Sequence, residues 1–75
     1  MEGGDNLSLY INILRACKEK GISVAKVERM CDFGNGRIRS WQRYRPTLGA
    51  VSLVANALGV TVEQLLRGSE TDIAP

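Results

Sequence analysis

The sequence contains no histidine, and its 75 residues include only two cysteines. Without histidine, the chain lacks the side chain that most often transfers protons near neutral pH, and its acidic residues are scattered along the chain. Cys17 and Cys31 do not have the spacing of metal ligands. We therefore expect no enzyme activity, no metal and no cofactor. The cysteines are interpreted as reduced thiols packed like small apolar residues, and a disulfide would need helices that bring them within bridging distance.

Long apolar stretches are also missing from the sequence. No run approaches the ~20 residues that a membrane-spanning helix needs. The first residues do not combine a basic stretch with an apolar one, so they are not a secretory signal. We expect a cytoplasmic protein with no membrane association. The length fits one domain at residues 7–68, with flexible ends at 1–6 and 69–75.

Helical spacing and capping residues predict five short helices and no strand. The expected helices run from Leu7 to about Lys20, from Ser23 to about Cys31, from about Asn35 to Arg43 or Tyr44, from Thr47 to about Leu58, and from Thr61 to Gly68. Ser23, Thr47 and Thr61 are favourable N-caps, and Thr61 forms a capping box with Gln64. Because none of these helices is long enough to be stable alone, they must share one core. The predicted fold is an all-α, compact five-helix bundle.

The segment NGRIRSWQRYR, residues 35–45, concentrates positive charge. It contains Arg37, Arg39, Arg43 and Arg45 and no acidic residue, although the formal net charge of the chain is only +2. No acidic residue lies between Asp32 and Glu63. On a helix, Ile38 and Trp41 would lie roughly 60° apart on the buried side. The opposite side would carry Gly36, Arg39, Ser40 and Arg43.

A basic outer surface of this kind favours binding to double-stranded DNA. Arginine pairs with guanine edges through two donors at once, and small residues allow a helix to enter the major groove closely. Lys26, Arg29, Arg45 and the helix starts at Ser23 and Thr47 are candidates for phosphate contacts. Trp41 could instead stack on bases of a single strand, but its spacing from Ile38 favours packing in the core.

From Leu9 to about Arg67 the chain resembles the Cro/repressor type of helix-turn-helix DNA-binding domain, the lambda-repressor-like family. The resemblance rests on SVAKVERMCDFGNGRIRSW and on RPTLGAVSLVANALGVTVEQLL. It implies core positions at Val27, Phe33, Ile38 and Trp41. It implies base-reading positions at Gly34, Asn35, Gly36, Arg39 and Ser40. With the basic side chains added, the predicted contacts to the DNA backbone are Ser23, Lys26, Arg37, Arg43, Arg45 and Thr47.

The sequence departs from the family pattern at two positions. Asp32 stands where the family usually has a glycine in the turn, and Asp tolerates left-handed backbone at some cost. Glu28 stands where the family usually has a small alanine. A buried Glu28 would need a partner, and an arginine of the 35–44 helix is the candidate.

These observations favour a sequence-specific DNA-binding transcriptional regulator, similar to small bacterial or phage repressors. Two other functions fit the same fold. One is a helical protein–protein interaction module, which should have an exposed apolar patch. The other is an antitoxin-like regulator that binds both a protein partner and DNA. A homodimer is a further hypothesis, and it would use the end of the chain around Val62, Leu65 and Leu66.

Overall fold

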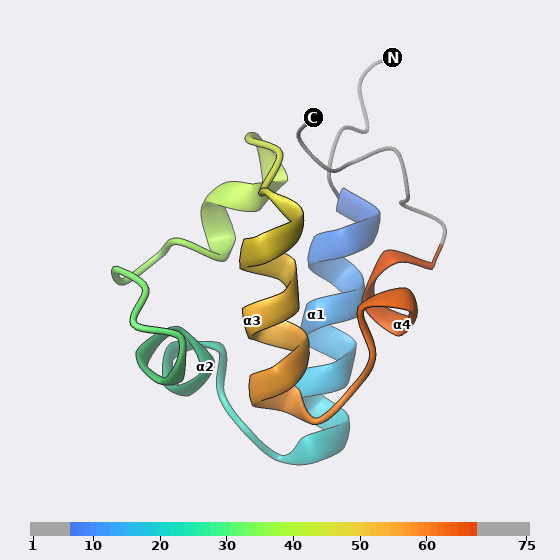
Figure 1. Ribbon diagram of the computed structural model, residues 1–75. Helices are drawn as coiled ribbons and strands as arrows, with labels where there is room; N and C mark the ends of the chain where they lie inside the picture. Colours follow the sequence, from blue (N-terminus) through green and yellow to red (C-terminus); the bar gives the residue numbers. More distant parts are fainter. Residues whose placement is uncertain (1–6, 68–75) are drawn as a thin grey trace.

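The computed structural model describes residues 7–67, which form four α-helices and one 3-10 helix (Figure 1). They are α1 (Leu7–Lys20), α2 (Val24–Met30), η1 (Arg39–Gln42), α3 (Leu48–Leu58) and α4 (Val62–Leu66). The helices α1 and α3 lie next to each other at the centre. Helix α2 contacts α3, and α4 contacts both central helices from the other side. The predicted all-α fold is confirmed, and the predicted flexible ends 1–6 and 69–75 lie outside the described residues.

One hydrophobic core joins all five elements. Its fully buried members come from α1 (Leu9, Ile13), α2 (Val27), the segment before η1 (Ile38), α3 (Val51, Val54) and α4 (Leu65). Trp41 of η1 is 2% exposed, while Phe33 is half-buried against the same core. No helix within residues 7–67 is long and apolar enough to cross a membrane.

Both cysteines are buried and free. Cys17 lies on α1, and Cys31 is the C-cap of α2. Burial raises the pKa of both thiols above the ordinary value, because the thiolate would lose its hydration. They are therefore small apolar members of the core, and the low reactivity of a raised-pKa thiol agrees with that role.

The three predicted N-caps are confirmed. The hydroxyl of Ser23 accepts a hydrogen bond from the Lys26 N–H at 3.1 Å, and that of Thr47 accepts from the Ala50 N–H at 3.2 Å. Thr61 and Gln64 form the expected capping box, with distances of 3.1 and 2.8 Å. Each bond satisfies a donor that has no partner inside its helix.

The predicted α-helix over 35–44 is wrong, so residues 7–67 contain four α-helices rather than the five predicted. Gly36 has a φ of +86°, which lies outside the right-handed helical region. Helical winding can therefore begin only after Gly36. Beyond it, the hydroxyl of Ser40 donates to the Arg37 carbonyl at 2.6 Å, while the Trp41 N–H bonds to the Ile38 carbonyl at 3.0 Å. Ser40 thus occupies the carbonyl that an α-helix would offer to Trp41, which favours the tighter 3-10 pattern.

Asp32 provides the left-handed residue that ends α2. Its φ is +61°, its N–H donates to the Arg29 carbonyl, and the Phe33 N–H donates to the Glu28 carbonyl at 2.8 Å. This pair of bonds is a Schellman motif, in which glycine is usually found. The predicted left-handed geometry of Asp32 is confirmed.

We expect Asp32→Gly to raise the free energy of unfolding by up to ~1 kcal/mol, because glycine removes the left-handed strain but loses more chain entropy on folding. Asp32→Ala, the matched control, should lower it by a similar amount, since alanine has neither the freedom of glycine nor the polar side chain of aspartate. Urea unfolding of the three proteins tests this. A glycine variant less stable than the parent would contradict it.

Of the three residues predicted for a dimer surface, Leu65 is not available for it. Leu65 is 1% exposed and belongs to the core of its own domain. Val62 and Leu66 are half-buried against that core. The large apolar side chains that are exposed on the helices instead include Ile11 and Leu14 of α1 and Leu48 and Leu53 of α3.

Candidate nucleic-acid interface

The basic segment, residues 35–45, is held to the core by an apolar side and an aromatic stack. Ile38 is fully buried and Trp41 is 2% exposed. The rings of Trp41 and Phe33 meet edge to face, with centroids 5.9 Å apart and planes at 70°. The Arg37 guanidinium lies over the Phe33 ring, 5.0 Å from its centroid. The stack fixes the segment against the domain and also limits where Arg37 can reach.

The outer side of the segment is a shallow depression of about 390 Å³. It is lined by Gly36, Arg39, Ser40, Gln42, Arg43 and Tyr44. The structure thus brings together the four residues that the sequence placed on the outer side: Gly36, Arg39, Ser40 and Arg43. Two guanidinium groups around a depression without an acidic side chain make a surface suited to a polyanion.

Gln42 and Tyr44 line this depression although sequence reasoning did not select them. Tyr44 is 67% exposed, and the Gln42 amide donates to the Arg39 carbonyl at 3.2 Å. On an α-helix, with 100° per residue, Gln42 would lie beside the core. In the 3-10 helix the residues follow one another at about 120°, which changes the side to which they point.

The two remaining predicted base-reading residues, Gly34 and Asn35, do not line that depression. Asn35 lines a second one, of about 270 Å³, together with Ala25, Glu28, Arg29 and Phe33. Gly34 is exposed in the turn before it. The predicted base-reading residues are therefore divided, with Asn35 beside α2 and with Gly36, Arg39 and Ser40 around the first depression.

All six residues predicted to contact the DNA backbone are accessible, although the hydroxyls of two of them already accept hydrogen bonds. Ser23, Lys26, Arg37, Arg43, Arg45 and Thr47 are exposed. Ser23 and Thr47 already accept capping hydrogen bonds, yet each hydroxyl still has a proton to donate. Arg45 lies between the 3-10 helix and α3, directly before the buried Pro46.

Glu28 of α2 holds the basic segment from the inner side. The prediction that an arginine would pair with Glu28 is wrong. The side chain is only 3% exposed. One carboxylate oxygen accepts the Gly36 N–H at 3.2 Å, and the other accepts the Ile38 N–H at 3.0 Å. The partners of the buried carboxylate are therefore backbone groups of the basic segment. The signal available in the sequence was a single charged residue at an apolar position of α2.

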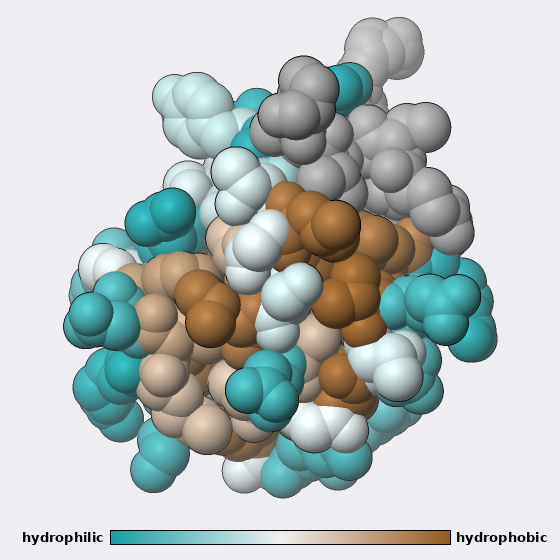
Figure 2. Space-filling view, viewed as in Figure 1, coloured by the Kyte–Doolittle hydropathy of each residue, from teal (hydrophilic) through white to brown (hydrophobic). Residues whose placement is uncertain are grey.

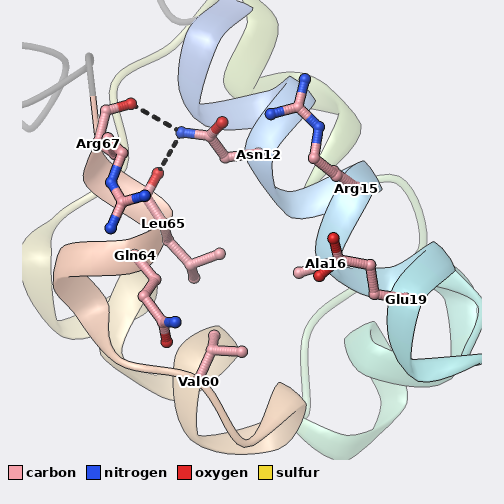
Figure 3. Close-up of a pocket in the computed structure, with 8 residues that line it drawn as sticks. All are labelled: Asn12, Arg15, Ala16, Glu19, Val60, Gln64, Leu65 and Arg67. Atoms are coloured by element: carbon pink, nitrogen blue, oxygen red, sulfur yellow. Dashed lines mark hydrogen bonds between the residues drawn. The ribbon is translucent and has the colours of Figure 1, made fainter.

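A pocket of about 190 Å³ between α1 and α4 lies apart from the basic segment (Figure 3). The Asn12 amide donates to the carbonyls of Leu65 and Arg67, at 2.8 and 3.0 Å, and so joins the two helices. Arg15 and Glu19 give the pocket both signs of charge. Among residues 7–67, no group of three or more His, Cys, Asp or Glu side chains could hold a metal ion.

This all-α arrangement of four α-helices and a 3-10 turn is similar to that of a transcription-factor structure. A hypothetical transcription factor, NHTF, from Neisseria aligns with a TM-score of 0.76 and 26% sequence identity. The alignment covers 89% of this chain and 80% of that chain. No family model and no curated protein sequence matches the chain. The resemblance to the Cro/repressor family therefore stays a prediction.

Proposed function

We propose that this chain is a sequence-specific double-stranded DNA-binding protein of the helix-turn-helix type, acting as a repressor-like transcriptional regulator. The observation that carries the proposal is the depression between Arg39 and Arg43, which is basic, free of acidic side chains and fixed to the core through Ile38 and Trp41. The similarity to a hypothetical transcription factor supports it. Binding would be non-covalent, and regulation would follow from occupying an operator in the cytoplasm.

Base reading would depend mainly on side chains beyond Gly36. Arg39 can present two parallel donors to the O6 and N7 acceptors of guanine, which is the commonest specific contact in the major groove. Ser40 and Gln42 add a hydroxyl and an amide beside it. Gly34, Asn35 and Gly36 add little bulk before the 3-10 helix, and a Cβ atom at either glycine would meet nothing within 4 Å. The backbone at this point can therefore lie close to a groove.

Contacts to phosphates would position the domain on either side of the reading segment. Lys26 and Ser23 come from the start of α2, while Arg45 and Thr47 come from the connection into α3. Arg37 and Arg43 extend from the segment itself. Such contacts supply affinity that does not depend on base sequence and that falls as salt rises.

We expect Arg45→Ala to weaken binding to all duplexes similarly and to flatten the plot of log K against log salt by about one unit, because one phosphate contact is lost. Fluorescence anisotropy of a labelled mixed-sequence duplex measures both effects. Arg15→Ala removes the same charge from the pocket beside α4 and is the matched control. Equal slopes for the two variants would show that Arg45 is outside the interface.

A protein-interaction module or antitoxin-like regulator is the second candidate, and one observation favours it. Ile11, Leu14, Leu48 and Leu53 are between 38% and 52% exposed. Helix α3 contains no charged residue, so its exposed side is neutral. Figure 2 shows hydrophobic surface over the α1 and α3 side of the molecule. A protein partner or a second copy of the chain bound there would leave the basic segment free for DNA.

A further inference from the structure

The charged side chain of Glu28 is buried on α2, directly beneath the basic segment. Among residues 7–67 it is the one charged side chain that is buried, with 3% of its surface exposed. A carboxylate in such a place is costly unless its oxygens accept hydrogen bonds. Here each oxygen accepts one backbone N–H, from Gly36 and from Ile38, on the two sides of Arg37.

These two N–H groups are at the start of the helical turns, where a helix has donors without internal partners. The side chain of the residue at the start of a helix usually accepts hydrogen bonds from such N–H groups. Gly36 has a φ of +86° and no side chain that could do so. The carboxylate therefore takes the place of the missing cap from another helix. Its negative charge also suits the positive end of the peptide dipoles.

We infer that Glu28 is the positioning residue of the DNA-reading segment, because it fixes the backbone from Gly36 to Ile38 and thereby the direction in which Arg39 and Ser40 leave it. This inference rests on the proposed function. Glu28 itself touches no DNA, since both of its oxygens face inward to backbone donors. It acts by holding the segment in the one geometry that a specific base contact needs.

Glu28→Gln is the sharpest variant for this role. Glutamine has the same shape, but it offers one acceptor oxygen where glutamate offers two, and its NH₂ group would face a backbone N–H. We expect the variant to fold, with hydrogen exchange at the Gly36 and Ile38 amides faster by roughly tenfold, the effect of one weakened hydrogen bond. The amides of α1 and α3 should exchange as in the parent.

The binding measurement uses two probes: a duplex enriched from a random-sequence pool by the parent protein, and a mixed-sequence duplex. Glu28→Gln should bind the enriched duplex about tenfold more weakly, the size of one lost base contact. Binding to the mixed-sequence duplex and its salt slope should change little, because the phosphate contacts remain. Preference between the two duplexes, rather than overall affinity, is thus the quantity that falls.

Leu65→Val is the matched control, because it weakens the core at α4 and leaves the basic segment untouched. A Gln variant that is partly unfolded is measured in sucrose, which favours the folded state. Parent-like exchange and preference in Glu28→Gln would overturn the inference. So would uniformly faster exchange with unchanged preference, as in the control. If the parent enriches no duplex from the pool and does not bind the mixed-sequence duplex, the proposed function fails, while exchange at Gly36 and Ile38 still decides whether Glu28 holds the segment.

Discussion

Replacing Trp41 by alanine is expected to lower the free energy of unfolding by roughly 3–5 kcal/mol, the range for truncating a buried large aromatic side chain. The indole is 2% exposed, and it packs edge to face against Phe33 in the core. A domain of this size has only a few kcal/mol of stability, so the variant should be largely unfolded at room temperature. Circular dichroism during urea unfolding measures the loss.

Trp41→Phe is the control for this prediction. Phenylalanine keeps an aromatic ring next to Phe33 and should retain most of the stability. The outcome that contradicts the prediction is a folded alanine variant that merely binds nucleic acid more weakly. Trp41 would then be a base-stacking residue on the surface, the alternative that the sequence alone left open.

Arg39→Ala is expected to weaken binding to the preferred duplex by ~1–3 kcal/mol and to relax the choice of base at one position. Arg39 is exposed on the rim of the depression, and its place at the start of the 3-10 helix is fixed by the buried Ile38 before it. Anisotropy titrations against the enriched duplex and its single-base variants measure both effects. Stability should be unaffected, since the side chain packs on the surface.

Two controls separate the recognition of a base by Arg39 from the effect of its positive charge. Arg39→Lys keeps the charge but loses the planar pair of donors, so it should recover the affinity for mixed-sequence DNA and not the base preference. Arg15→Ala removes an equal charge near α4 and should leave both quantities close to those of the parent. Base preference that survives in Arg39→Ala would remove Arg39 from the reading set.

The helices that could be predicted from the sequence are those whose signals are local. Ser23, Thr47 and Thr61 cap the helices that they precede, and the apolar spacing of α3 is the one that the core uses. In α1 the core uses Leu9, Ile13 and Cys17, whereas Ile11 and Leu14, which the same helical spacing also aligns, are exposed. These features depend on residues within one or two turns of each other. Ile38 and Trp41 could be placed on the inner side for the same reason. Residues three positions apart lie on the same side of a 3-10 helix as they do on an α-helix, and both side chains are buried.

The basic segment was harder to predict because its geometry depends on contacts that spacing does not reveal. The positive φ of Gly36 and the bond from Ser40 to the Arg37 carbonyl replace an α-helix by a 3-10 helix. The two bonds to Glu28 cross between elements. Leu65 was misassigned to a dimer surface because an apolar residue in a short terminal helix gives no sign of which side it buries.

Ile11 and Leu14 of α1 and Leu53 of α3 are exposed apolar residues that the DNA proposal does not use. A repressor-like protein that acts on two half-sites needs contact between two copies, and α3 is neutral and partly apolar on its outer side. The same surface would serve a different protein in an antitoxin-like regulator. Both arrangements would leave the basic segment accessible, so they are compatible with the reading role proposed for Arg39.

The most direct test of the central claim is a chemical-shift titration of isotopically labelled protein with mixed-sequence duplex DNA at low and moderate salt. The account predicts changes confined to Ser23, Lys26, residues 34–45 and Thr47, and these changes should fade as salt rises. An absence of changes at low salt would contradict DNA binding. Changes centred instead on Ile11, Leu14 and Leu53 would also contradict the proposed interface, because they would place the contact on the apolar side of α1 and α3.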